Sequence, residues 1–119
     1  MKKYAFMVCA LFVSWTVFCQ TQADMNNIAA KEYELADKEL NLVYTQIRAK
    51  YAQQPLLLSK LRDAQLLWIR FRDASVDALY PDGPVASMYV MLRYGFLERL
   101  TRDRIEQLRD CYLKETYYP

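Results

Sequence analysis

The stretch LRDAQLLWIRFRDA, residues 61–74, decides the fold class of this chain. Apolar residues recur in it every three or four positions, at Leu61, Ala64, Trp68 and Phe71. This spacing places them along one side of an α-helix, which has 3.6 residues per turn. We therefore expect one face of this helix to be buried, with Trp68 and Phe71 in the core.

The same periodicity predicts a helix on each side of this stretch. The first is expected at about residues 26–52, capped by a short polar side chain at positions 24–27. The second begins near Pro55, a residue suited to a first helical turn, and the third spans about residues 87–113. Gly95 allows a kink or a break in the third helix. The expected core stripes are Ala29, Tyr33, Ala36, Leu40, Val43, Tyr44, Ile47 and Tyr51; Leu57, Leu61, Ala64, Trp68, Phe71 and Ala78; and Met88, Leu92, Phe96, Leu100, Leu108 and Tyr112.

The connections between the helices are short. Only residues 53–54 separate the first two helices, so we expect these to be antiparallel neighbours. The second connection, Tyr80-Pro81-Asp82-Gly83-Pro84, has the composition of a turn. The sequence therefore predicts an all-α fold, a small antiparallel bundle of three main helices that forms one domain over residues 20–119.

The first 19 residues have the layout of a secretory signal peptide. Lys2 and Lys3 precede an uncharged, mostly apolar run at residues 4–18, and polar residues follow from Gln20. That run is too short to span a bilayer, which takes about 20 apolar residues. We expect cleavage after Cys19, with cleavage after Ala23 as the alternative. The bulky Phe18 argues against a lipoprotein anchored through Cys19, so a periplasmic or secreted location with no stable membrane span is expected.

Charge and cysteine content narrow the possible partners. The chain has 16 basic and 14 acidic residues, and removal of Lys2 and Lys3 with the signal peptide leaves 14 of each. A neutral secreted protein is a poor nucleic-acid binder, because that class has a basic excess. Cys111 would then be the only cysteine, which predicts either a buried free thiol or a homodimer linked through Cys111.

The charges are distributed unevenly along the chain. The first helix is acidic, whereas the segment from Arg48 to Arg72 has six basic residues and only Asp63 as an acid. One interpretation is that these helices attract each other across the bundle. The other is that the acidic face binds a cationic partner such as a lysozyme.

Histidine is absent from the whole sequence. This removes the usual general base and the usual metal ligand. A single mature cysteine offers no zinc site, and two glycines form no phosphate-binding loop. We therefore expect neither a catalytic site nor a cofactor, and we interpret the chain as a binding protein rather than an enzyme.

The turn after the second helix is the favoured contact site for a partner. Tyr80 offers an aromatic anchor and Asp82 a carboxylate, and the prolines stiffen the turn, which limits the entropy lost on binding. Arg72 and Asp73 are further partner-contact candidates. The alternatives are that the turn is an ordinary connector and that Arg72 pairs with a carboxylate of the first helix.

Three runs of residues together resemble the LprI-like family of small secreted bacterial proteins. They are Ala36-Asp37-x-x-Leu40-Asn41-x-x-Tyr44, Ala64-Gln65-x-x-Trp68-x-x-Phe71-Arg72-Asp73-Ala74 and Leu100-Thr101-x-x-Arg104-x-x-x-Leu108. The resemblance covers about residues 22–108 and implies a helical secreted protein; at least one member of the family is held to inhibit lysozyme. We expect the motif residues to be structural, namely Asp37, Leu40, Asn41, Tyr44, Gln65, Trp68, Phe71, Thr101 and Arg104.

The chain departs from the resemblance in its cysteines. The family usually has cysteines where this chain has Ile28, Val76 and Phe96. These apolar substitutes suit buried sites, and the loop after the second helix is expected to be looser without a disulfide. The leading functional hypothesis is inhibition of a lysozyme-like muramidase, and the alternatives are an envelope adaptor that inhibits nothing and an immunity protein against a rival's toxin.

Overall fold

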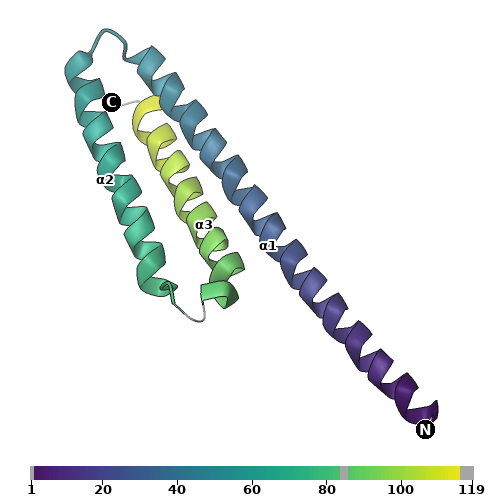
Figure 1. Ribbon diagram of the computed structural model, residues 1–119. Coiled ribbons are helices and arrows are strands. Elements are labelled where there is room, and N and C mark those ends of the chain that lie inside the picture. Colours follow the sequence, from purple (N-terminus) through teal and green to yellow (C-terminus); the bar gives the residue numbers. More distant parts are fainter. Residues whose placement is uncertain (1, 84–85, 116–119) are drawn as a thin grey trace.

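The computed structural model describes residues 2–83 and 86–115, and the side chains of residues 21–83 and 88–115. Three helices form it: α1 (Lys2–Lys50), α2 (Pro55–Leu79) and α3 (Val90–Leu108). A short 3₁₀ helix, η1 (Ala86–Tyr89), precedes α3, and one π-helical turn, η2 (Arg109–Leu113), follows it. The predicted all-α bundle of three helices is confirmed (Figure 1).

Helix α1 begins far upstream of the expected start. It is continuous from Lys2, so the polar residues at positions 24–27 do not cap it. No glycine or proline occurs before Pro55, and nothing in the sequence therefore forces the helix to begin later. The N-terminal part of α1 extends well beyond the other two helices (Figure 1).

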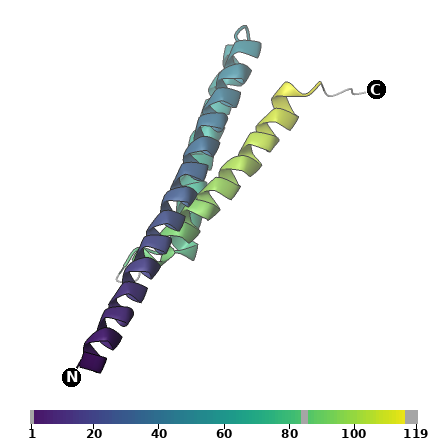
Figure 2. The same ribbon diagram turned by 90° about the vertical axis from the view of Figure 1, so that its right-hand side faces the viewer.

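The closest partner of α1 is α3, although α2 follows α1 in the chain. Helices α1 and α2 run antiparallel across the turn at residues 51–54, as predicted, but α1 packs mainly against α3. Figure 2 shows α3 tilted with respect to both other helices and lying to one side of them. The side of the α1–α2 pair away from α3 is consequently left open.

The core lies where α1 meets α3. Leu40, Val43 and Ile47 of α1 are buried together with Ile105 and Leu108 of α3, and Leu61 is the contribution of α2. The expected stripe of α1 is thus confirmed at its centre. Partly buried Trp68 and Tyr112 pack against the edge of this cluster.

Helix α2 is rotated relative to the prediction. Phe71, expected in the core, is 62% exposed, whereas Arg72 beside it is only 8% exposed. The buried positions of α2 are Leu61, Arg72 and Val76. The prediction for Phe71 was wrong because Arg72 occupies the buried face of α2. A search for apolar residues at helical spacing does not identify a charged residue as buried.

Helix α3 buries Leu108 as expected, but the rest of its buried stripe differs from the prediction. Met88 and Leu92 are 73% and 43% exposed, and the buried residues are Thr101, Ile105 and Leu108. The expected row stepped four residues at a time, which advances 40° more than one turn at each step and so spirals around the helix. The helix continues through Gly95 without a break, and its irregular turns lie at the two ends.

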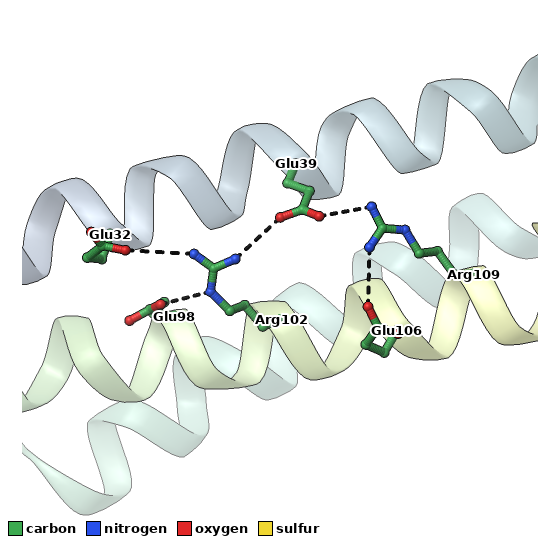
Figure 3. Close-up of polar contacts among 6 residues, drawn as sticks. All are labelled: Glu32, Glu39, Glu98, Arg102, Glu106 and Arg109. Carbon is green, nitrogen blue, oxygen red and sulfur yellow. Dashed lines mark hydrogen bonds and ion pairs between the residues drawn. The ribbon is translucent and has the colours of Figure 1, made fainter.

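Ion pairs join α1 to α3 beside the core (Figure 3). Glu39 accepts from Arg109 at 2.9 Å and from Arg102 at 3.3 Å. Arg102 also pairs with Glu98 at 2.8 Å and lies 3.9 Å from Glu32. The acidic face of α1 was expected either to attract the basic second helix or to remain free for a cationic partner. Three of its five ion pairs in the described part of the chain are instead made with Arg102 of α3 and Arg109 of η2, and one is made within α1. Among the described residues of α2, Arg72 alone pairs with it.

The end of the bundle is closed by contacts to one carbonyl. The backbone oxygen of Tyr112 accepts from Lys50 Nζ at 2.8 Å and from the Tyr51 hydroxyl at 2.9 Å. The rings of Tyr51 and Tyr112 meet edge to face, 6.1 Å apart. These contacts hold η2 against the C-terminal end of α1.

Candidate functional site

A groove lies between α1 and α2. It has a volume of about 680 Å³ and lies on the side of the pair away from α3, since all its lining residues belong to α1 or α2. Five of the residues expected to be structural line it, and these are Asp37, Leu40, Asn41, Tyr44 and Gln65. Some of the residues that carry the family resemblance therefore border a groove.

Arg72 closes one end of the groove. Its Nη1 lies 3.9 Å from Asp37 of α1, and its Nε donates to Asp73 at 2.9 Å. The guanidinium also lies over the rings of Tyr33 and Trp68, at 5.7 and 5.2 Å from their centres. Burial among these groups leaves Arg72 little surface to offer a partner, and it ties α1 to α2.

Arg104 of α3 holds Trp68 from another direction. Its guanidinium lies 5.8 Å from the Trp68 ring, and its Nε donates to Gln65 at 3.1 Å. Burial lowers the pKa of Arg104 from its ordinary value. The Gln65 side chain of α2 thus borders the groove, and its oxygen accepts a hydrogen bond from Arg104 of α3.

Thr101 is the other motif residue of α3. It is fully buried, and its hydroxyl has no hydrogen-bond partner among the described residues. Phe71, the remaining motif residue, points to solvent. Three motif residues accordingly contribute to packing between helices and not to the groove, namely Trp68, Thr101 and Arg104.

Two arginines that lie outside the family motifs line the end of the groove opposite Arg72. Arg48 of α1 and Arg62 of α2 both line it. Neither forms an ion pair with any residue in the described part of the chain. The uneven charge between positions 48 and 72 was the sequence signal for this basic surface.

The turn after α2 is held from inside. The Tyr80 ring contacts the rings of Tyr89 and Phe96, 5.6 and 6.5 Å away between centres. The Tyr80 carbonyl accepts from Arg93, which also pairs with Asp77 at 2.8 Å. Tyr80 is therefore an internal anchor of the turn rather than a projecting aromatic group.

Asp82 and Gly83 form the exposed tip of this turn. Gly83 has a φ of +153°, a conformation that a side chain would strain. Pro84, the last residue of the predicted turn, lies outside the described residues. Asp82 consequently presents a carboxylate to solvent at this end of the bundle.

The cysteine-related predictions have mixed outcomes. Val76 is buried and Phe96 is half-buried, but Ile28 is 61% exposed, so the expectation that all three substitutes are buried was wrong. Cys111 is a free, exposed thiol in η2, which contradicts its interpretation as a buried residue. A homodimer linked through Cys111 stays a prediction, which electrophoresis without reductant would test.

The described residues contain no group of acidic or cysteine side chains that could hold a metal ion. In the same residues, no helix is long and apolar enough to cross a membrane. The signal peptide prediction concerns side chains outside the described set.

Comparison with known proteins places this arrangement in a family. The model of the family described as "Lysozyme inhibitor LprI" matches residues 19–108, which include all three bundle-forming segments and every motif residue. The chain belongs to the LprI family. An uncharacterized protein of Rhizobium meliloti (strain 1021) is 33% identical to it over 104 residues, covering 76% of this chain and 73% of the relative. No solved structure matches this LprI family member.

Proposed function

We propose that the mature protein, residues 20–119, is a periplasmic or secreted binding protein that inhibits a lysozyme-like muramidase. The observation that carries this proposal is the family match over residues 19–108, which covers the complete helical bundle. The chain lacks histidine, so binding rather than catalysis is the activity that its side chains support.

The turn at Tyr80–Gly83 is the contact element of this proposal. A protein that occludes an enzyme's cleft needs a convex element that keeps its shape on binding. Anchoring of the Tyr80 ring and carbonyl supplies that rigidity, and Asp82 supplies an exposed charged group at the tip. The exposed carboxylate suits a cationic partner such as a lysozyme, because opposite charges across an interface attract.

The test is a lysis assay with purified residues 20–119 and lysozymes of several classes. Protection of a cell-wall suspension at a near-stoichiometric ratio is the expected result. Asp82→Lys should weaken protection at least about tenfold, since it reverses a charge at the contact. Asp103→Lys is the matched control, because Asp103 is equally exposed but lies on α3, and it should change protection by less than about twofold.

Two outcomes decide between this proposal and its rivals. Absence of protection against every class, by protein whose circular dichroism is helical, overturns muramidase inhibition. The alternatives are then an envelope adaptor and an immunity protein. Rescue of toxin-treated cells by the chain would favour the immunity protein, and a purified envelope partner without enzyme activity would favour the adaptor.

A further inference from the structure

We propose that the groove between α1 and α2 is a docking site for an acidic amphipathic segment of a partner protein, seated by Arg48 and Arg62. This surface is separate from the turn at Tyr80–Gly83, and the inference does not depend on muramidase inhibition. It is carried by the placement of two arginines, by the apolar side chains between them and Arg72, and by the length of the groove.

The register of α1 and α2 sets Arg48 opposite Arg62. The Asp37–Arg72 contact at 3.9 Å fixes which residues face each other. Arg48 lies eleven residues after Asp37, and Arg62 lies ten residues before Arg72. Because the helices are antiparallel and both rise about 1.5 Å per residue, the two arginines reach the same level on opposite walls.

The two arginines give the groove an excess of positive charge. Arg72 is balanced by Asp37 and Asp73, whereas Arg48 and Arg62 have no carboxylate partner among the described residues. Two like charges that face each other across a groove repel, and an anion between them relieves that repulsion. The guanidinium group also binds a carboxylate through two parallel hydrogen bonds.

Apolar side chains form part of the lining between the charged ends. Leu66 and Ile69 line the α2 wall between Arg62 and Arg72, and Leu40 lines the α1 wall. Asn41, Tyr44 and Gln65 add polar groups between them. Leu66 is 50% exposed, so its burial by an occupant would be favourable. Two arginines without carboxylate partners and apolar side chains beside them favour a peptide with acidic and apolar side chains as the occupant.

The length of the groove fits a helical segment. From Asp37 to Arg48 it follows about three turns of α1, or roughly 16 Å. A helix laid there would complete a four-helix arrangement, with α3 on one side of the α1–α2 pair and the partner on the other. Binding of an amphipathic helix in a groove is an established mode of peptide recognition.

The test uses a labelled helical peptide of about 12 residues, with leucines on one face and glutamates beside them. Fluorescence anisotropy with the chain of residues 20–119 should detect binding, and replacement of the glutamates by glutamine should weaken it about tenfold. The double variant Arg48→Glu/Arg62→Glu should lose binding to the acidic peptide by a similar factor. The variant Lys60→Glu/Arg70→Glu is the matched control, because it changes the net charge equally at exposed α2 residues that do not line the groove.

Each alternative outcome overturns the proposal. Failure of the acidic peptide to bind, or equal binding of its glutamine counterpart, removes the role of the arginines. If both double variants lose peptide affinity equally, the overall charge of the protein explains the binding and the groove does not. If muramic-acid oligosaccharides bind and the peptide does not, the groove is a site for an anionic glycan. If the chain self-associates and Arg48→Glu/Arg62→Glu abolishes this, the groove is a site for a second copy of the chain. Circular dichroism of each variant confirms that it is folded, and loss of muramidase inhibition would leave the peptide result unaffected.

Discussion

The face of α1 that meets α3 and the face that borders the groove differ in how far their polar groups are satisfied. Toward α3, Glu39 pairs with two arginines next to the buried side chains of Val43 and Ile47. Toward α2, the 3.9 Å contact of Asp37 with Arg72 is the only ion pair between the two helices among the described residues, and Arg48 has no ion-pair partner there. The first face stabilises the fold, and the second remains available for recognition.

The largest expected effect lies in the core on the α3 side. Ile47→Ala should lower the free energy of unfolding by about 2–5 kcal/mol, since it removes a fully buried side chain and leaves a cavity. Leu42→Ala, on the same helix but 58% exposed, should cost less than about 1 kcal/mol. Urea denaturation measures both, and similar losses in the two variants would contradict the assignment of the core.

On the α2 side, Arg72 should matter most. Arg72→Ala should cost about 2–3 kcal/mol, because it removes a buried guanidinium from between two aromatic rings and leaves Asp37 unpaired. Arg70→Ala, at an exposed position two residues away, is the control and should change stability by less than about 0.5 kcal/mol. If Arg72→Ala were as mild as its control, α2 would be held by other contacts.

A smaller effect is expected for the ion pairs between α1 and α3. Glu39→Gln should cost about 1 kcal/mol at low salt, and the loss should shrink as salt is added, because the pairs are partly exposed. Glu34→Gln removes an exposed pair with Lys38 within α1 and should have less than half that effect. A loss at Glu39 that is independent of salt would point to packing rather than charge.

The smallest expected effect is a pH dependence at Tyr33, which packs against Arg72. Burial raises the pKa of the Tyr33 phenol above its ordinary value. The native state therefore holds this proton more tightly than the unfolded state, so its contribution to stability is present below about pH 10 and is lost as pH rises through the folded pKa. When the pH is raised from about 9 to about 11, the free energy of unfolding should fall less in Tyr33→Phe than in the unaltered protein, as measured by urea denaturation. Parallel losses in the two proteins would exclude this contribution.

Sequence patterns predicted the helices better than their faces. The existence of three helices and the stripe of α1 followed from apolar periodicity, because Leu40, Val43 and Ile47 are apolar and buried. The face of α2 did not, since Arg72 is buried by stacking on rings that come partly from another helix. Such burial depends on tertiary contacts and leaves no apolar signal in the sequence.

The candidate site was predicted only in part. The motif of Asp37, Asn41 and Tyr44 drew attention to one wall of the groove, but its spacing could not show whether these residues face a core or a surface. The position of Arg48 opposite Arg62 across the groove depends on the register between the two helices. That register is set by the turn and by Arg72, and a single-helix pattern does not contain it.

The preference of α1 for α3 has a consequence for the order in which the chain can fold. The core residues of α1 are covered by Ile105 and Leu108, which are synthesised about sixty residues later. A nascent chain that ends before α3 has two helices but no closed core, so it cannot collapse prematurely into a stable domain. We therefore expect a packed core to form only after the last helix has been made, so that an incomplete chain has helices without stable tertiary structure.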